Sequence, residues 1–462
     1  MSGRTTDVIY PFTEEPIGRA ALAGPADIDL AVRAARAAFD TGPWPRTTPA
    51  ERAAILRRAG AGIDARKEQF VRLTTLEVGS PLQGVGRQVD VARHFLEWHA
   101  DQAETYAWEE ERPGVFSSLL VRRVPVGVVG AIVPWNFPLG LTLPKLCPAL
   151  LTGCTVVLKP AEETPLYAFL LAEVFEEAGL PPGVLNVVPA DRTVSEGLVT
   201  HPLVDKISFT GSSRAGSRIG SLCGEGIKRC ALELGGKSAA IILDDADLET
   251  VIPELAPVTM RNSGQACVNQ TRVLAPAASY EAVVEALAVT IAAFPVGDPS
   301  DPDTVVGPLI SETQRTRVEG YIAAGKEQGA RLVVGGGRPR QLERGYFVEP
   351  TIFADVDNDM TIAREEIFGP VVCVIRYDGD DEAVAIANDS DYGLSGSVWC
   401  RDPERALSIA RRVRTGNIGI NQSMLDLGGP FGGFKRSGLG REYGLEGIDG
   451  YAELQQVTSP AA

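Results

Sequence analysis

The sequence predicts an α/β protein in which two domains each contain a doubly wound parallel sheet, together with one small β element. The 462 residues exceed the roughly 250–300 residues beyond which a single hydrophobic core rarely grows. From Val124 onward, short β-branched runs alternate with helical segments, which is the pattern of parallel sheets. A second α/β unit begins near Lys237, so the pattern indicates two such sheets.

Segments outside the sheets are predicted from local patterns. Residues 26–100 read as helical, and Thr48 to Glu51 form a capping box with proline at the first helical position. Residues 104–123 have the pattern of a protruding hairpin. The last segment, 451–457, alternates like a strand with nothing after it to pair. Such a strand often adds to the sheet of a partner, which favours an oligomer.

Each sheet is predicted from its own strands and helices. For the first sheet we expect strands at 126–133, 155–158, 184–188 and 206–209, and helices at 165–178 and 215–223. Thr164 and Pro165 should cap the first of these helices, and Gly179 should end it. For the second sheet we expect a strand at 239–243 and helices near 247–264, 279–294, 312–329, 381–388 and 402–413.

Composition excludes several classes of function. A formal net charge of -16 disfavours nucleic acid and anionic membranes as partners. The N-terminus lacks the apolar stretch of a signal peptide, and the apolar runs are shorter than the about 20 residues that span a bilayer. The seven cysteines show no CxxC spacing and the three histidines form no HExxH. We therefore expect a cytoplasmic protein without structural disulfides or a metal site.

Cys267 has the setting that best suits a nucleophile. It follows Asn262-Ser-Gly-Gln-Ala, a polar, glycine-containing approach that exposes backbone amides. Such amides lower the pKa of a thiol and can hold an oxyanion. The other six cysteines are interpreted as small buried hydrophobic residues.

Two further polar residues follow predicted strands. Glu233 stands in Leu232-Glu-Leu-Gly-Gly at an apolar strand end, where burial would raise its pKa and make it a general base. Taken alone, an ordinary ion-paired glutamate is an equal interpretation. Asn136 follows the strand expected at 126–133, at the edge where doubly wound sheets bind ligands, and its amide can donate to an oxyanion. A simple turn is the alternative for Asn136.

Generic nucleotide-binding motifs are missing from the sequence. No GxGxxG follows the first strand, and Gly211–Gly216 lacks the Lys-Ser/Thr ending of a Walker A loop. These patterns alone do not identify the cofactor.

Seven motifs together resemble the aldehyde dehydrogenase superfamily, from about residue 8 to residue 457. They are PWNFP at 134–138, KPAEETP at 159–165, FTGS at 209–212, LELGGKS at 232–238, GQAC at 264–267, EEIFGP at 365–370 and PFGGFKRSGLGRE at 430–442. Any one could arise by chance, but seven in the family's order are highly specific. The resemblance implies an aldehyde-dehydrogenase-like fold with a dinucleotide-binding domain at 1–105 and 126–234, a catalytic domain at 235–440, and a β oligomerisation element at 106–125 and 441–462.

The resemblance also implies catalytic roles. Cys267 would attack the aldehyde, and after hydride transfer a thioester would remain on its sulfur. The side-chain amide of Asn136 and the backbone N–H of Cys267 would hold the oxyanion. Glu233 would activate the water that hydrolyses the thioester. Glu442 matches a second acid that relays protons, and Lys145 follows Asn136 at the family's spacing.

The cofactor implied by the resemblance is nicotinamide adenine dinucleotide. Lys159 and Glu162 match the residues that hold the adenosine ribose. A carboxylate there accepts hydrogen bonds from the 2′-OH and repels a 2′-phosphate, so NAD is favoured over NADP. Gly211 and Ser212 match the pyrophosphate and nicotinamide turn. The residues matched to the nicotinamide side are Trp135, Glu366 and Phe368.

Substrate selection is less defined by the sequence. The loop 421–429 lines the aldehyde tunnel in the family, and the candidate apolar tunnel residues are Phe137, Leu141, Met424, Leu427 and Phe431. Arg261 lies six residues before Cys267, where succinate-semialdehyde dehydrogenases carry a carboxylate-binding arginine. Their usual second arginine is replaced here by Pro144. We therefore interpret Arg261 first as structuring the approach to Cys267, with a carboxylated substrate as the alternative.

The leading hypothesis is a hydrolytic, NAD-dependent aldehyde dehydrogenase that forms a homodimer or homotetramer. A CoA-acylating relative typically lacks the glutamate base, so Glu233 argues against it. A non-catalytic relative would not need this full set of residues. A cysteine hydrolase predicts a Cys–His pair, and no histidine lies in any motif.

Overall fold

The first sheet places its strand ends around a switch in strand order. The computed structural model describes residues 3–460, and its six-stranded sheet has the order β17-β9-β8-β5-β6-β7. The strands are β5 (Val128–Ile132), β6 (Thr155–Lys159), β7 (Leu185–Val187), β8 (Lys206–Thr210), β9 (Arg229–Glu233) and β17 (Gly438–Leu439). The chain adds β6 and β7 on one side of β5, then β8 and β9 on the other. The carboxyl ends of β5 and β8 therefore flank the crevice where such sheets bind ligands.

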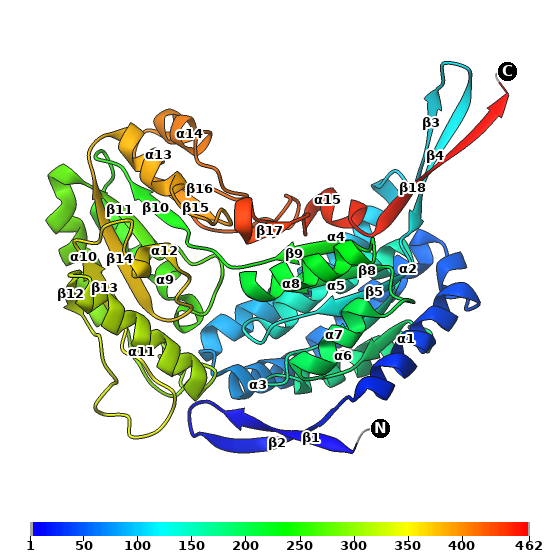
Figure 1. The fold of residues 1–462 in the computed structure, drawn as a ribbon, viewed down its shortest axis with the longest axis horizontal. Helices are drawn as coiled ribbons and strands as arrows, with labels where there is room; N and C mark the ends of the chain where they lie inside the picture. Colours follow the sequence, from blue (N-terminus) through cyan, green and yellow to red (C-terminus); the bar gives the residue numbers. More distant parts are fainter. Residues whose placement is uncertain (1–2, 461–462) are drawn as a thin grey trace.

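Helices cover both faces of this sheet (Figure 1). They are α1 (Pro25–Asp40), α2 (Pro49–Ala65), α3 (Lys67–Val78), α4 (Leu82–Thr105), α5 (Pro138–Thr152), α6 (Leu166–Glu177), α7 (Arg192–Thr200) and α8 (Ser213–Glu225). One apolar cluster joins the sheet to α2, α4, α5 and α6, and another joins it to α1, α7 and α8. The predicted capping box is confirmed, because Thr48 Oγ1 accepts from the Glu51 N–H and the Glu51 carboxylate accepts from the Thr48 N–H at 2.7 Å.

The start of α6 differs from the prediction. Its N-cap is Pro165, and no side chain of its own segment caps it. Instead, the buried carboxylate of Glu77 on α3 accepts from the N–H groups of Leu166 at 2.6 Å and Tyr167 at 3.3 Å. Burial raises the pKa of Glu77 to about 8, although these two hydrogen bonds act against the rise. Local sequence could not show this cap because it comes from another helix.

The second sheet has seven strands in the order β12-β13-β14-β11-β10-β15-β16, and only β12 runs antiparallel to its neighbour. They are β10 (Ala239–Ile242), β11 (Arg272–Pro276), β12 (Arg331–Val334), β13 (Thr351–Ala354), β14 (Val371–Tyr377), β15 (Gly396–Trp399) and β16 (Gly419–Ile420). The helices are α9 (Leu248–Met260), α10 (Tyr280–Ala292), α11 (Glu312–Glu327), α12 (Thr361–Arg364), α13 (Asp380–Asn388) and α14 (Pro403–Ala410). The helix predicted to reach residue 264 ends at Met260, because Asn262 and Ser263 have left-handed backbone angles.

A three-stranded antiparallel arm projects from the body of the molecule (Figure 1). It consists of β3 (Glu109–Pro113), β4 (Ser117–Pro125) and β18 (Ala452–Pro460), in the order β18-β4-β3. The last predicted strand, 451–457, has a partner earlier in the chain, since β18 pairs with β4 along its whole length. The strand predicted at 126–133 is also shorter and begins at Val128, because the Val126 N–H bonds the Tyr451 carbonyl and Gly127 has a φ of +127°.

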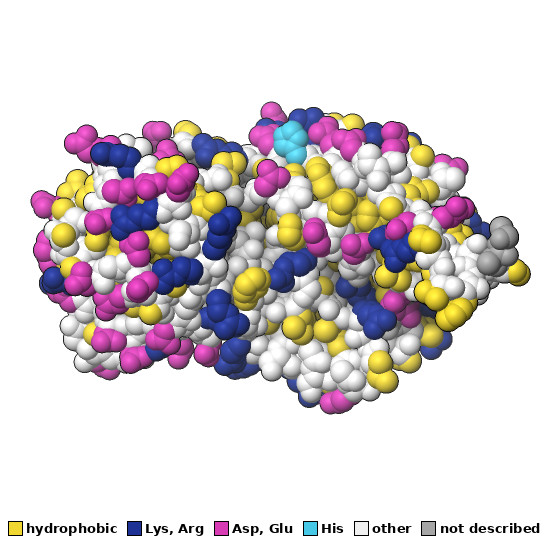
Figure 2. Space-filling view, turned by 90° about the horizontal axis from the view of Figure 1, so that it is seen from above, with side chains coloured by type: hydrophobic (Ala, Val, Ile, Leu, Met, Phe, Trp, Pro, Cys, Tyr) yellow, Lys and Arg dark blue, Asp and Glu magenta, His cyan; other side chains and the backbone are white. Residues whose placement is uncertain are grey.

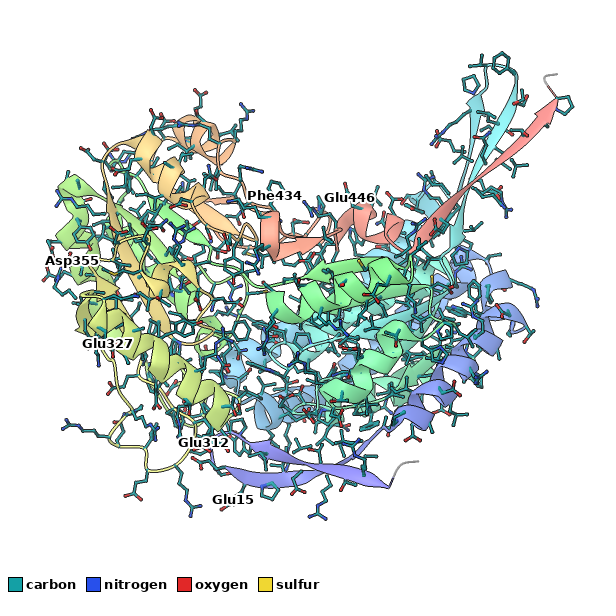
Figure 3. All side chains as sticks on the ribbon, viewed as in Figure 1. Glu15, Glu312, Glu327, Asp355, Phe434 and Glu446 are labelled. Carbon is teal, nitrogen blue, oxygen red and sulfur yellow. The ribbon has the colours of Figure 1, made fainter. Side chains whose placement is uncertain are left out.

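Two further segments tie the halves together. The hairpin of β1 (Arg4–Tyr10) and β2 (Glu15–Leu22) runs beneath the molecule (Figure 1), and Tyr10 donates a hydrogen bond to Asp298 at 3.0 Å. The C-terminal segment crosses back from the second sheet to β17 and α15 (Gly444–Asp449). Phe434 lies on this crossing (Figure 3), where its N–H donates to the Gly393 carbonyl at 2.7 Å.

The surface seen in Figure 2 mixes acidic and basic side chains, and several lysine and arginine side chains lie where the two halves meet. Within residues 3–460, no helix is both long and apolar enough to cross a membrane.

Candidate active site

Asn136 and the loop of Cys267 meet beyond the carboxyl end of β5. The Asn136 side chain is 2% exposed, and its Nδ2 donates to the carbonyl of Gln265 at 2.9 Å. Gln265 stands two residues before Cys267, so the amide lies beside the chain that carries the thiol. The two predicted residues come from different sheets, and the structure brings them together.

Two glycines allow neighbouring segments to contact the backbone around the Cys267 loop. A Cβ on Gly236 would lie 2.6 Å from the Cys267 carbonyl oxygen, so the LELGG segment needs glycine at this contact. Gly264 has a φ of +79°, and a Cβ there would lie 2.0 Å from the backbone of Gly369. The segments around Glu233, Cys267 and Glu366 therefore meet through their backbones.

The Cys267 thiol is harder to ionise than the sequence suggested. Burial raises its pKa to about 12, and the negative charges of Glu366 and Glu233 act in the same direction. The backbone amides of Cys267 and Val268 lower the pKa, as expected, but they do not overcome burial. The amides thus act in the direction that the sequence predicts, and burial has the larger effect on the thiol pKa.

Glu233 is the last residue of β9 and is 3% exposed. Neither of its carboxylate oxygens accepts a hydrogen bond from any residue within 3–460. Burial raises its pKa well above the usual value, and the charge of Glu442 adds to the rise, while Lys145 and Arg441 oppose it. A Cβ on Gly432 would lie 2.7 Å from Glu233 Oε1, so this glycine leaves space beside the carboxylate.

Lys145 and Glu442 form a buried ion pair next to Glu233. The Nζ of Lys145 donates to Glu442 Oε1 and, at 2.6 Å, to Thr210 Oγ1 at the end of β8. The backbone of Glu442 is fixed by a two-way pairing with Phe431 at 2.6 and 2.7 Å. An ammonium and two carboxylates are thus enclosed together, an arrangement suited to moving a proton.

The residues matched to the nicotinamide side lie close to one another. The rings of Trp135 and Phe368 meet edge to face, with centroids 5.4 Å apart. Glu366 Oε1 accepts from the Gly236 N–H at 3.1 Å, and burial raises the pKa of Glu366 to about 7. Phe368 has a φ of +61°, and its carbonyl accepts from Gln314 at 2.7 Å.

The residues matched to the phosphate and adenosine side follow β8 and β6. Ser212 is exposed and caps α8 by accepting from the Ala215 N–H at 3.3 Å. The Gly211 N–H donates to the Glu233 carbonyl at 3.0 Å, which ties this turn to the carboxylate strand. Lys159 ends β6 with a buried side chain whose Nζ is 3.4 Å from the Ala190 carbonyl, and Glu162 is half-buried just beyond it.

The predicted tunnel residues differ in their surroundings. Phe137 and Leu141 lie partly buried at the start of α5, and Phe431 is buried against Tyr443 with ring centroids 5.0 Å apart. Leu427 packs against the apolar cluster of the first sheet. Met424, in contrast, is 79% exposed and lines a hollow of about 400 Å³ whose lining includes none of the other four residues.

Arg261 is exposed immediately after α9, and its carbonyl accepts from Asn269 Nδ2 at 3.0 Å. Its positive charge is within electrostatic reach of Cys267. The structure therefore gives Arg261 a structural contact through its backbone, while burial lowers the pKa of its guanidinium.

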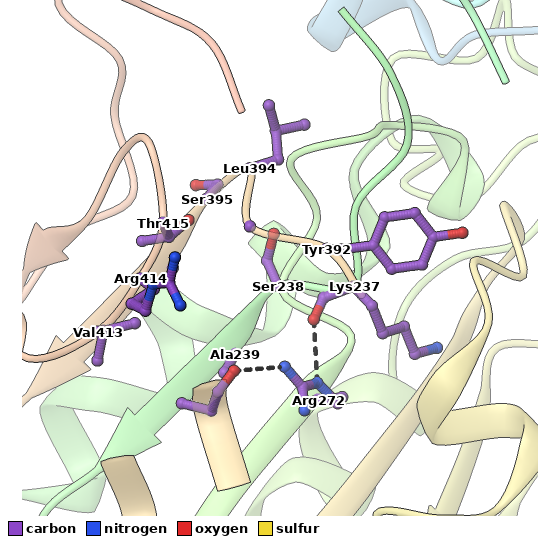
Figure 4. A pocket seen from close by; sticks show the side chains of 13 residues that line it. Lys237, Ser238, Ala239, Arg272, Tyr392, Leu394, Ser395, Val413, Arg414 and Thr415 are labelled. Carbon is purple, nitrogen blue, oxygen red and sulfur yellow. Dashed lines mark hydrogen bonds between the residues drawn. The ribbon is translucent and has the colours of Figure 1, made fainter. Parts of the chain in front are cut away.

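Sequence reasoning missed Ser437, although it lies within a quoted motif. Its hydroxyl donates to the Gly235 carbonyl at 2.7 Å and accepts from the Gly393 N–H at 2.9 Å. It thus joins the Glu233 strand to the second sheet. A small cavity of about 10 Å³ lies farther along this junction (Figure 4). Its lining includes Lys237 and Ser238, and its size suits a single water rather than a substrate.

Comparisons with known proteins agree on one family. The family model described as "Aldehyde dehydrogenase family" matches residues 1–457. The chain is 50% identical to geranial dehydrogenase of Castellaniella defragrans, over 99% of this chain and 95% of the relative. Mycobacterium tuberculosis aldehyde dehydrogenase complexed with NAD+ superposes with a TM-score of 0.99 and 51% identity, over 100% and 96% of the two chains. A Pseudomonas syringae aldehyde dehydrogenase C mutant complexed with NAD+ and octanal superposes with a TM-score of 0.97 and 42% identity, over 100% of this chain and 95% of that chain.

Proposed function

Because this chain belongs to the aldehyde dehydrogenase family, we propose that it oxidises an aldehyde to the carboxylic acid with NAD, through a thioester on Cys267. The observation that supports this most is the convergence of a thiol, a neutral amide and a buried carboxylate. Asn136 bonds the loop two residues before Cys267, Gly236 touches the Cys267 carbonyl, and Glu233 raises the thiol pKa by its charge.

Glu233 takes the protons in this scheme. A thiol with a pKa of about 12 is protonated at neutral pH, so attack on the aldehyde requires a base. The raised pKa of Glu233 makes its carboxylate basic enough for that role, and then for activating the water that hydrolyses the thioester. The buried pair of Lys145 and Glu442 adjoins Glu233 and provides a path for the proton to leave.

Asn136 stabilises the negative oxygen that forms on attack. Its amide has two N–H groups, and one is bonded to the Gln265 carbonyl. The other remains for the oxyanion, together with the backbone N–H of Cys267. Fixed amide donors in a water-poor site are worth about 10²–10³-fold in rate.

The residues around the switch point fit NAD. Ser212 opens the 13-residue helix α8 and is exposed, which suits a pyrophosphate at a helix N-terminus. The Glu162 carboxylate suits a free ribose 2′-OH better than a 2′-phosphate. When bound, NAD supplies the hydride acceptor. In this scheme residues 1–105 and 126–234 bind the dinucleotide, and residues 235–440 carry the thiol.

For the substrate we propose an apolar aldehyde. Similar proteins are named for geranial or were crystallised with octanal, and the partly buried Phe137 and Leu141 adjoin Asn136. The positive charge of the Arg261 guanidinium, within electrostatic reach of Cys267, favours a carboxylated semialdehyde as the second candidate.

NADH formation by the purified protein tests both candidates. The panel contains aliphatic, aromatic and terpenoid aldehydes, betaine aldehyde and succinate semialdehyde, each with NAD and NADP. Preference for apolar aldehydes supports the first candidate. Preference for succinate semialdehyde that is lost in Arg261→Ala supports the second. No turnover of any aldehyde, with NAD still bound, would contradict the proposed oxidation.

We propose that the protein works in the cytoplasm as a homodimer or homotetramer. The outer edge of β18 has no partner strand within residues 3–460, and Leu454 and Val457 on that strand are exposed. An edge of this kind pairs readily with another chain. Light scattering on the full-length protein and on Leu454→Glu tests this, because a charge on the edge should weaken the assembly.

A further inference from the structure

We propose that Asn262 positions the oxyanion amide of Asn136, and thereby sets the rate of attack by Cys267 without touching the substrate. The inference rests on the proposed function, in which Asn136 holds the oxyanion. Asn262 lies five residues before Cys267 and is 8% exposed. Its side chain contacts both chain segments that form the oxyanion site.

The Asn262 amide bonds three groups at once. Its Nδ2 donates to the backbone carbonyl of Asn136 at 2.9 Å and to that of Gln265 at 3.4 Å. Its Oδ1 accepts from the hydroxyl of Ser80 at 2.5 Å. Because carbonyl oxygens only accept, the two Nδ2 contacts fix the orientation of this amide, and Ser80 satisfies the remaining oxygen.

These bonds converge on the acceptor that orients Asn136. The Gln265 carbonyl receives Nδ2 of Asn262 and also Nδ2 of Asn136, the latter at 2.9 Å. Asn262 therefore holds Asn136 at its main chain and also holds the acceptor of its side chain. Since the two N–H directions of a planar amide are linked, fixing the first aims the second.

The backbone at Asn262 shows why this residue type stands here. Asn262, Ser263 and Gly264 have φ values of 52°, 57° and 79°, three left-handed residues in succession. Asparagine tolerates this region better than most other residues, and glycine adopts it freely. The turn reverses the chain after α9 and directs Cys267 back toward β5. Asn262→Gly therefore removes the amide while keeping a residue that accepts this backbone.

The test is a double-mutant cycle of Asn262→Gly and Asn136→Ala, read as kcat, KM and kcat/KM with NAD affinity measured by titration. Asn262→Gly alone should lower kcat by about 10–100-fold with KM and NAD affinity nearly unchanged, because the lost stabilisation belongs to the transition state. In the Asn136→Ala background the same change should cost less than about 3-fold, since the amide it positions is already gone.

Two more variants keep the cycle interpretable. Ser80→Ala removes only the hydroxyl that holds Asn262 Oδ1, and it should give a smaller loss in kcat of about 2–5-fold. Ser263→Ala is the matched control, because Ser263 is also left-handed but its hydroxyl donates to the Gly307 carbonyl at 2.9 Å rather than to the Asn136 segment. It should retain kcat within about 2-fold.

Equal losses from Asn262→Gly in both backgrounds would overturn the inference, because Asn262 would then act independently of Asn136. If Asn136→Ala lowers kcat and Asn262→Gly does not, the inference about Asn262 is overturned and the proposed function still stands. An Asn136→Ala variant as active as the parent would overturn both. If Asn262→Gly fails to fold, Ser80→Ala takes its place in the cycle. Its loss in kcat in the parent is then compared with its loss in the Asn136→Ala background, and equal losses overturn the inference.

Discussion

On the Asn136 side of the site, neutral amides and a hydroxyl bond one another, and both atoms of the Asn262 amide have partners. On the Glu233 side, two carboxylates and an ammonium are enclosed, and both oxygens of Glu233 lack a hydrogen bond within residues 3–460. A satisfied neutral network holds geometry at little electrostatic cost. An unsatisfied buried carboxylate has a raised pKa, and it is the group that can exchange a proton.

Replacing Cys267 removes the sulfur atom on which the Asn136 side and the Glu233 side both act, and we expect the largest loss of turnover from this change. Cys267→Ala should lower turnover by at least about 10⁴-fold, because the loop 262–269 that meets Asn136 holds no second thiol. NAD affinity should remain near that of the parent. Steady-state NADH formation and NAD titration measure the two quantities. Normal turnover in this variant would remove Cys267 from the mechanism.

Glu233→Gln removes the base and leaves the amide side intact. The variant should still form a thioester slowly, release one burst of NADH and then stall, with the steady-state rate lowered about 10²–10⁴-fold. Stopped-flow absorbance separates the burst from the steady state. An unchanged steady-state rate at neutral pH would show that another group activates the water.

Glu442→Gln tests the electrostatic coupling on the charged side. Because the charge of Glu442 raises the pKa of Glu233, its loss should lower that pKa and move the rising limb of the kcat–pH profile to lower pH. The now unpaired, buried Lys145 should also reduce the free energy of unfolding by about 3–5 kcal/mol. A stable variant whose pH profile is unmoved would contradict the coupling. Thr142→Ser on α5, also buried, is a control.

Glu162→Ser should have the smallest effect, since it lies on the cofactor side. Removing the carboxylate should lower the ratio of kcat/KM for NAD over NADP by about 10-fold, because a 2′-phosphate would no longer be repelled. Glu176→Ser, an exposed carboxylate on α6, is the control. An equal ratio of kcat/KM for NAD over NADP in the parent and in Glu162→Ser would show that Glu162 does not contact the ribose.

Features fixed by neighbouring residues could be predicted from the sequence, and features fixed by distant contacts could not. The capping box at Thr48 is correct because both partners lie within one turn. The helix predicted to reach residue 264 is too long, since the residue types at Asn262 and Ser263 do not by themselves indicate a left-handed backbone. The pairing of β18 with β4 joins residues more than 300 positions apart, so local patterns could not predict it, and only the resemblance grouped 106–125 with 441–462 in one β element.

The same distinction applies to the site. Order and spacing of the motifs identified Cys267, Glu233 and Asn136, which the structure brings together. The sequence predicts the effect of the backbone amides on the Cys267 pKa, but it could not give the larger, opposite effect of burial, because the loss of water around a side chain depends on the whole fold. Ser80, Ser437 and Asn262 were missed because each acts through one hydrogen bond or a few to segments distant in the sequence.

The path of the C-terminal segment has a consequence for synthesis. Glu442 and the strand β17 beside Glu233 lie more than 200 positions after Glu233 in the chain. During synthesis the strands β5 to β9 can therefore pair well before residues 438–442 emerge, yet the carboxylate environment of Glu233 forms only once those residues are present. A product whose synthesis stops between Cys267 and Gly438 would keep the thiol and lack the ion pair beside its base.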